Sequence, residues 1–368
     1  MKKMSKKTRS NLLNALLIVG TIGAVLIIGA ANGDIDDAWR TMISADPGYL
    51  ALAVVSFCVF VFFEAMTTYM FFRYQGLRVR MGTCVLVTLI GLFYSNVTPG
   101  STGGQPLQVI TLKKRGVPSG YTTSALAVKF FCFQCALLIL GTVLWIMNWD
   151  FSFEHIGAVR WLIYLGYFIN SLGVAGVVLL AINRTMVRNT LMFFIRFGQK
   201  IRLVKDLDKT TRRLDKALDD FHTSVDMMTH QPRRLFFIFL VSCVQVMGLM
   251  SIVYFVTLAL GVTEYSYLQI VTLQFLLYIG VSFTPTPGAS GSQEGGFYLI
   301  FSRIFPAGKI LGALLVWRFF TYYLSMIISL IFGVLIDSVR TMRGTIKKVE
   351  LPRGLKHMPD WEEEHETD

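Results

Sequence analysis

Six apolar runs, each close to 20 residues or longer, constrain the fold of this chain more than any other feature. A helix of roughly 20 apolar residues crosses a hydrocarbon core about 30 Å thick, and in lipid a helix satisfies the backbone polar groups of one such run internally. Charged residues make up 16% of the 368 residues, whereas soluble proteins contain about 25%. We therefore expect an all-α polytopic membrane protein with six transmembrane helices, at residues 12–30, 49–72, 121–147, 159–182, 235–262 and 310–336.

Two further apolar blocks, residues 81–112 and 265–302, are each interrupted by a proline–glycine element. The first element is TPGSTGGQ at residues 98–105, and the second is TPGASGSQ at residues 286–293, 188 residues later. The apolar arms on either side of each element are about 10 to 16 residues long, which is too short to cross a bilayer. The pattern predicts two re-entrant hairpins rather than two additional spans.

The runs and the broken blocks together form an inverted repeat. At the offset of 188 residues, residues 49–147 correspond to residues 237–335. We expect residues 1–340 to form one membrane domain and residues 341–368 to form a cytoplasmic tail. Within the domain, a cytoplasmic loop at 184–234 contains an amphipathic pattern, with positions three or four apart at 204, 207, 211, 214, 218, 221 and 225. We expect a helix there, which packs under the bundle or binds the lipid surface or a partner.

The distribution of Lys and Arg predicts the orientation of the chain. These residues gather on the cytoplasmic side of membrane proteins, and most of the 35 lie at the N-terminus, on both sides of the first broken block, in the long loop and in the tail. Both termini are then cytoplasmic, and the two hairpins enter the membrane from opposite faces, as in many transporters. The first run follows a basic start, as a signal peptide does, but it is longer than the 7 to 15 apolar residues typical of one, so we expect an anchoring span.

The proline–glycine elements are expected to form a polar site. Non-helical backbone persists at membrane depth only where protein or a water-filled cavity supplies hydrogen-bond partners. Glycines allow a tight turn and leave amides open to a ligand, while the hydroxyl and amide side chains add donors and acceptors. An alternative is a pair of structural kinks packed against neighbouring helices. The candidate substrate-binding residues in the two turns are Thr98, Pro99, Gly100, Gly103, Gln105, Thr286, Pro287, Gly288 and Gln293.

Four charged residues, Glu64, Lys129, Glu294 and Arg318, lie inside apolar segments. Charges at bilayer depth are costly and usually face a cavity. Lys129 and Arg318 each lie about nine residues into the span that follows a hairpin, or roughly 13 Å deep. Two cations beside two polar turns suit a phosphate headgroup, which arginine engages through a bidentate fork. The glutamates would neutralise the cations or bind a cationic headgroup, and the alternative is that these ion pairs only hold the bundle together.

We expect this chain to bind no metal, no cofactor and no nucleic acid. The five cysteines lie in apolar stretches, where a disulfide framework or a zinc site is not expected, and Cys132-x-x-Cys135 lacks the βαβ setting of a redox motif. The five histidines lie outside the apolar runs, and the chain has neither a P-loop nor an H-E-x-x-H motif. The formal net charge of +12 is an orientation signal rather than a nucleic-acid footprint.

Three stretches resemble a known family: TPGSTGGQPLQVITLKKRGV at 98–117, TPTPGASGSQEGGF at 284–297 and WRFFTYY at 317–323. They are similar to the lysylphosphatidylglycerol synthase transmembrane region, the flippase-like domain of the multiple peptide resistance factor family. In that family the domain moves aminoacylated phosphatidylglycerol from the inner to the outer leaflet of the bacterial membrane, which lowers negative surface charge and blunts cationic antimicrobial peptides. The resemblance implies that the two turns, Glu294 and Arg318 are the working parts.

The resemblance also implies a division of labour. Full-length members add a cytosolic aminoacyl-tRNA-dependent transferase domain, whereas only a short tail follows Ile336 here. We therefore expect a stand-alone membrane domain that works beside a separate lipid-modifying enzyme.

The expected function is translocation of a phospholipid, such as aminoacylated phosphatidylglycerol or a similar polar lipid, between leaflets of the bacterial cytoplasmic membrane. The expected partner is a membrane phospholipid, and homo-oligomers are compatible with the sequence. One alternative is a membrane-embedded transferase of the phosphatidylglycerol lysyltransferase type, because a membrane enzyme can place Glu, Lys and Arg in a cavity. A small-solute transporter is the third possibility.

Overall fold

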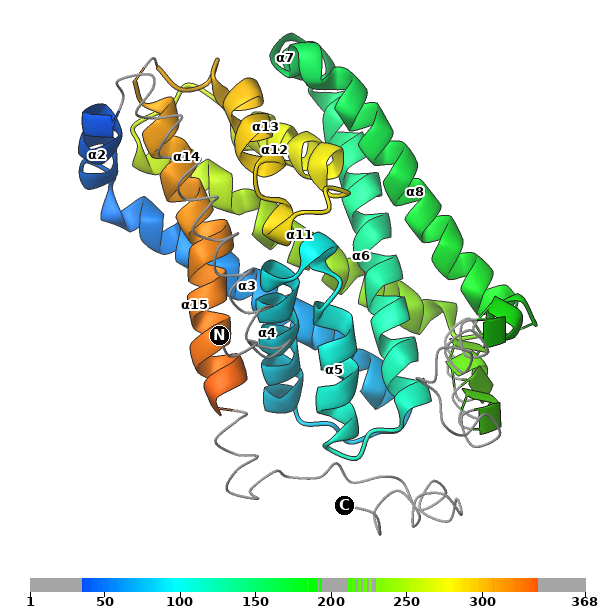
Figure 1. Cartoon of the computed structure of the whole chain (residues 1–368). Coiled ribbons are helices and arrows are strands. Elements are labelled where there is room, and N and C mark those ends of the chain that lie inside the picture. Colours follow the sequence, from blue (N-terminus) through cyan, green and yellow to red (C-terminus); the bar gives the residue numbers. More distant parts are fainter. Residues whose placement is uncertain are drawn as a thin grey trace, which may run out of the picture.

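The computed structural model describes residues 35–183, 230–306 and 308–336, together with short segments between residues 185 and 226. Within these ranges the chain is helical and forms no strand. The first predicted span, at residues 12–30, and the tail at 341–368 lie outside the described residues. Figure 1 shows long helices with two helical hairpins among them.

Five helical segments of the described chain are long and apolar enough to cross a membrane. They agree within a few residues with five of the six predicted spans, so the expected all-helical membrane fold is confirmed. The last segment is irregular, because α14 (Ile310–Arg318) and α15 (Leu324–Ile328) alternate with the π-helical turns η4 (Phe319–Tyr323) and η5 (Ser329–Leu335). The five segments are α3 (Pro47–Tyr74), α6 (Ser119–Met147), α8 (Arg160–Ile182), α11 (Pro232–Ala259) and Ile310–Leu335.

Helix α3 illustrates how local sequence sets the ends of a span. Asp46 precedes it, and the Asp46 carboxylate accepts a hydrogen bond from the Gly48 amide at 2.7 Å, which satisfies a donor that the helix leaves free. Pro47 occupies the first turn, where its missing amide costs nothing. The helix ends before Gly76, whose φ of 77° is readily adopted only by glycine.

Each broken block folds into a helical hairpin. The first hairpin consists of α4 (Met81–Val97), the turn η1 (Pro99–Ser101) and α5 (Gly104–Lys113), and the second consists of α12 (Tyr267–Val281), the turn η3 (Pro287–Ala289) and α13 (Ser292–Phe301). The helix order α3, α4, α5, α6 thus recurs as α11, α12, α13, α14. The turns of the two hairpins contact each other near the middle of the molecule (Figure 1). The membrane face from which each hairpin enters stays a prediction.

The helices α3 and α11 cross in close contact. A methyl group added to Gly248 of α11 would lie 3.0 Å from the Phe60 amide nitrogen of α3 and 3.2 Å from the Ser56 carbonyl oxygen, so glycine is what allows the backbones to approach this closely. Gly248 and Phe60 are separated by the same 188 positions as the two turns. This crossing and the contact between the turns therefore both join corresponding parts of the repeat.

The remaining described segments connect or cover this core. They include α2 (Ile35–Ile43), α7 (Trp149–Ile156) and η2 (Gly157–Val159). Of the five described positions of the stripe in the loop 184–234, Leu218, Phe221 and Val225 are buried and positions 211 and 214 are half-buried. The Ser124 hydroxyl of α6 donates to the Phe221 carbonyl at 3.2 Å. This part of the predicted amphipathic stripe packs against the bundle, and positions 204 and 207 lie outside the described residues.

Candidate functional site

The two proline–glycine turns have the same backbone conformation. Gly100 has φ 59° and ψ 23°, and Gly288 has φ 59° and ψ 24°. The following residues, Ser101 and Ala289, have φ 56° and 51°, in the left-handed region that costs a side chain roughly 1 to 2 kcal/mol. The sequence match between the turns is therefore a structural match, and the chain keeps strained backbone at both positions, a feature that clusters at functional sites.

The turns meet, but their surroundings differ. A methyl group on Gly100 would lie 3.9 Å from Cα of Pro285, at the base of the second turn. In the first turn Pro99, Gly100 and Gln105 are exposed, whereas in the second Pro287 and Gln293 are buried. The two matching turns are therefore unequally buried, and the polar cavity that we expected between them stays a prediction.

The first turn is closed by its own side chains. The Thr98 hydroxyl donates to the Tyr94 carbonyl at 2.6 Å and accepts from the Gly103 amide at 2.8 Å. A methyl group on Gly104 would lie 2.7 Å from the backbone carbonyl oxygen of Gly91, so a glycine is required where α5 folds back onto α4. Thr98 and Gly103 are therefore held by turn-internal bonds, while Gln105 points outward from the beginning of α5.

Arg318 and Glu294 form a buried ion pair at the second turn. The Arg318 Nε donates to Oε1 of Glu294 at 2.6 Å, and Nη2 donates to the Gly288 carbonyl at 3.1 Å and to Oγ of Ser290 at 3.2 Å. The second Glu294 oxygen accepts from the Gly291 amide at 2.7 Å, at the N-terminus of α13, where the helix dipole favours a carboxylate. Arg318 is 6% exposed and Glu294 8%. The guanidinium thus ties the last span directly to the turn.

Tyr322 connects this pair to the first hairpin. It lies one turn after Arg318, within η4, and the guanidinium carbon lies 4.9 Å from the Tyr322 ring centroid. The Tyr322 hydroxyl donates to the Asn96 carbonyl, in the last turn of α4, at 3.1 Å. Its ring also packs on Gly288, where a methyl group would come within 2.2 Å of Cε2. Single π-helical turns are frequent at functional sites, and this one places an aromatic ring between the two hairpins.

Lys129 and Glu64 form a second ion pair on the other side of the first hairpin. The Lys129 Nζ lies 2.9 Å from Oε1 of Glu64, with side chains 12% and 10% exposed. Nζ also donates to Oε1 of Gln108 in α5 at 3.3 Å, and the Gln108 amide nitrogen donates to the Val87 carbonyl of α4 at 3.3 Å. Span α3, span α6 and the first hairpin therefore meet at one buried cation.

The charged candidates thus form two groups instead of one. Both cations that we expected beside a phosphate have a glutamate within hydrogen-bonding distance, which agrees with the neutralising role given to the glutamates in the sequence. The two glutamates do not occupy equivalent positions in the repeat, because Glu64 lies in the span before the first hairpin and Glu294 lies within the second hairpin. Among the described residues, no hydrogen bond links the Lys129 group to the Arg318 group.

Four further residues were not among the sequence candidates: Asn96, Gln108, Ser290 and Tyr322. Tyr322 could have been found from the sequence, since it lies four residues after the candidate Arg318, whereas buried Gln108 faces away from the exposed candidate Gln105. Asn96 and Ser290 contribute through contacts between segments far apart in the chain. Of the candidates themselves, Gln293 is 7% exposed and its Oε1 has no hydrogen-bond partner among the described residues. A buried amide oxygen without a partner is costly, and a ligand with a donor group would satisfy it.

The described cysteines are all free thiols. Cys132 is buried in α6, and Cys135 lies partly exposed one turn further on. No group of three His, Cys, Asp or Glu side chains with the spacing of a metal site occurs in the described ranges.

The fold and site define a class: an all-helical membrane protein whose two helical hairpins meet at proline–glycine turns beside buried ion pairs. The chain belongs to the lysylphosphatidylglycerol synthase TM region family, whose model matches residues 12–329. It is also similar to a UPF0104 membrane protein of Archaeoglobus fulgidus, with 26% identity over 257 residues, or 68% of this chain and 75% of that protein. A UPF0104 membrane protein of Pyrococcus horikoshii is 23% identical over 292 residues, or 76% of this chain and 83% of the relative. The family resemblance drawn from the motifs is confirmed.

Proposed function

We propose that this protein moves a phospholipid between the two leaflets of a membrane, with the headgroup passing the second turn and the acyl chains remaining in lipid. The observation that most supports this proposal is the Arg318–Glu294 pair, which is bound to a non-helical turn that contacts the other hairpin. Ionisable groups inside a membrane usually line a substrate pathway. The family description, which names lysylphosphatidylglycerol, supports a lipid substrate.

The paired charges favour a headgroup that contains both a phosphate and an ammonium. A purely anionic headgroup that approaches Arg318 meets the carboxylate of Glu294, 2.6 Å from the guanidinium. A headgroup with both charges can place its phosphate on the guanidinium and its ammonium on the carboxylate, and the unpartnered Gln293 Oε1 accepts a further donor. Aminoacylated phosphatidylglycerol has this chemistry, as does phosphatidylethanolamine.

Translocation requires that the contact between the hairpins opens. In the described arrangement the first turn is exposed and the second is covered, which corresponds to access from one side. The hairpins separate when the two hydrogen bonds that join Asn96 to the last span break, and the two halves then expose the pair to the other side, as in alternating-access transporters. In a bacterial cytoplasmic membrane, export of an aminoacylated lipid would lower the negative charge of the outer surface and reduce the binding of cationic peptides.

The test is leaflet exchange in proteoliposomes that contain a panel of fluorescent phospholipids. We expect the purified protein to exchange lysylphosphatidylglycerol and phosphatidylethanolamine faster than phosphatidylglycerol. The double variant Arg318→Met/Glu294→Gln should exchange lipids no faster than protein-free liposomes, because it lacks both charges. It should still fold, since replacing a buried ion pair by neutral residues is often neutral for stability. Removing Arg318 alone is a poorer test, because it leaves Glu294 buried without a counter-ion.

A matched control pair lies in the loop. Arg188 contacts Asp215 through Nε at 2.6 Å, with side chains 43% and 36% exposed. The variant Arg188→Met/Asp215→Asn removes the same two charges far from the hairpins and should exchange lipids at the wild-type rate. Equal rates for both double variants would count against the proposal.

A membrane-embedded lipid transferase is the second candidate, and the word synthase in the family description favours it. Lipid extracts of an expressing strain distinguish the two functions. A new lipid species that depends on Arg318 and Glu294 indicates a transferase, whereas an unchanged lipid inventory with a changed leaflet distribution indicates translocation.

A further inference from the structure

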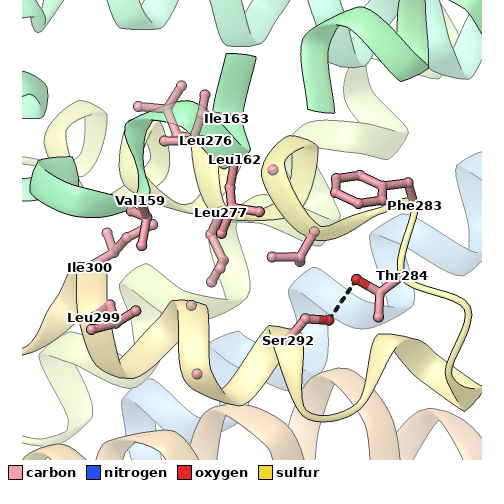
Figure 2. Close-up of a pocket in the computed structure, with 14 residues that line it drawn as sticks. Val159, Leu162, Ile163, Leu276, Leu277, Phe283, Thr284, Ser292, Leu299 and Ile300 are labelled. Carbon is pink, nitrogen blue, oxygen red and sulfur yellow. Dashed lines mark hydrogen bonds between the residues drawn. The ribbon is translucent and has the colours of Figure 1, made fainter. Parts of the chain in front are cut away.

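A cavity of about 280 Å³ lies between helix α8 and the second hairpin. Figure 2 shows Leu162 and Ile163 of α8 on one side and Leu276 and Leu277 of α12 beside them, with Leu299 of α13 facing them. Most of the lining is aliphatic, and Gly280 of α12 and Gly295 and Gly296 of α13 complete it. None of these lining residues belongs to the two ion pairs.

One end of the cavity is polar and borders the second turn. The Ser292 hydroxyl donates to Oγ1 of Thr284 at 2.8 Å, and both residues line the cavity (Figure 2). Ser292 directly precedes Gln293 and Glu294, and Thr284 lies two residues before Thr286. The cavity therefore runs from an apolar interior to the turn that binds Arg318.

Hydrocarbon is the occupant that fits this lining. Water does not fill a cavity that offers it almost no polar partners, and an unfilled cavity deprives its lining of dispersion contacts. The rim contains Gly295, which is exposed, and Leu299, which is 56% exposed, so the cavity is open to the surroundings of the bundle. In a membrane those surroundings are acyl chains.

We propose that this cavity binds one acyl chain of the transported phospholipid, with the glycerol ester region at Thr284 and Ser292. This proposal rests on the proposed function, in which the headgroup binds at Arg318 and Glu294. The second hairpin then contacts the lipid at two places, the headgroup and one acyl chain. An ester carbonyl accepts hydrogen bonds from hydroxyl groups, and the chemical order of a phospholipid, chain then ester then headgroup, is the order in which the cavity, the two hydroxyls and the ion pair follow one another.

Gly295 allows the cavity to be filled without disturbing the helix. It lies within α13, and a methyl group added to it meets no atom within 4 Å. Gly176 in α8 is a matched control, because it is also helical with nothing within 4 Å and does not line the cavity. The variants Gly295→Leu and Gly295→Phe fill the space in two steps, and Gly176→Phe adds the same bulk elsewhere. Monodisperse elution and similar melting temperatures of the three variants establish that they fold.

The experiment is photo-crosslinking in proteoliposomes with phosphatidylethanolamine that contains a diazirine on one acyl chain, followed by peptide mass spectrometry. Leu172 of α8, 55% exposed, is an internal standard for Leu299, 56% exposed. We expect labelling at Leu299 to exceed labelling at Leu172 severalfold, to decrease in Gly295→Leu, to fall to the level of Leu172 in Gly295→Phe and to stay unchanged in Gly176→Phe. Equal labelling of the two leucines in the wild type, or labelling that Gly295→Phe leaves unchanged, would overturn the inference.

The labelling result is independent of leaflet exchange. Enriched labelling that Gly295→Phe removes, in a protein without measurable exchange, establishes the acyl-chain site and rejects translocation. Normal exchange with even labelling retains translocation and rejects the acyl-chain site.

Discussion

At the scale of single residues, the Lys129–Glu64 pair has the properties of a buried ion pair, in which each partner depends on the other. Both side chains are about nine-tenths buried, and among the described residues only Gln108 adds a further bond to the ammonium. Removing one partner leaves the other charge buried without compensation, at a cost of about 3 to 5 kcal/mol. We therefore expect Glu64→Gln and Lys129→Met each to lower the free energy of unfolding by several kcal/mol, and the double variant to recover most of that loss.

Chemical denaturation in mixed micelles measures these differences in the free energy of unfolding. The exposed Arg188–Asp215 pair serves as the control for the buried pair. An exposed pair contributes about 0 to 1 kcal/mol, so Arg188→Met should change the free energy of unfolding little. A loss of less than about 1 kcal/mol in both single variants of the Lys129–Glu64 pair would mean that water reaches the pair. Lipid exchange by the double variant separates the two roles left open by the sequence: full exchange makes the pair structural, and lost exchange makes it part of the lipid pathway.

At the scale of elements, the two turns permit a matched comparison. Gly100 and Gly288 have the same left-handed backbone, so an alanine at either costs about 1 to 2 kcal/mol in backbone strain. A methyl group on Gly100 has no neighbour closer than 3.8 Å, whereas on Gly288 it comes within 2.2 Å of the Tyr322 ring. We expect Gly288→Ala to destabilise the protein more than Gly100→Ala, as measured by thermal unfolding. The excess should disappear when Tyr322→Ala is added, and an excess that persists would place its origin elsewhere in the turn.

The same two turns show how far sequence reasoning reached. Apolar run length predicted five described spans and both hairpins, because a bilayer leaves few backbone alternatives, and the repeated TPG element predicted the two turns, whose equal backbone is a finding of the structure. The repeated element did not predict that the two turns are unequally buried, because burial of the second turn depends on the last span. Arg318 and Tyr322 of that span pack on Gly288, and among the described residues nothing equivalent packs on Gly100. The partner of Lys129 was likewise beyond reach, since the pairing of Glu64 with a residue 65 positions away depends on how α3 and α6 are rotated.

At the scale of the whole molecule, the two contacts between corresponding parts of the repeat differ in character. The crossing of α3 and α11 at Gly248 is a close backbone approach within a buried core, and packed interiors resist gradual deformation. The contact between the turns involves exposed Gly100 and Pro285, and beside it Asn96 of α4 makes two hydrogen bonds to the last span. We therefore infer that the crossing stays fixed and that the turns separate when the protein changes its access.

A disulfide between the turns tests this inference. A Cβ at position 100 would lie 3.9 Å from Cα of Pro285, which is compatible with the Cβ separation of about 3.5 to 4.5 Å that a disulfide needs. In a background without the five native cysteines, Gly100→Cys/Pro285→Cys should form the bond under oxidation, and lipid exchange in proteoliposomes should stop and then resume after reduction. Each single-cysteine variant should exchange lipids at the same rate with and without the oxidant. Continued exchange by fully cross-linked protein would mean that the lipid crosses the membrane while the turns stay together, so that the moving parts lie elsewhere in the bundle.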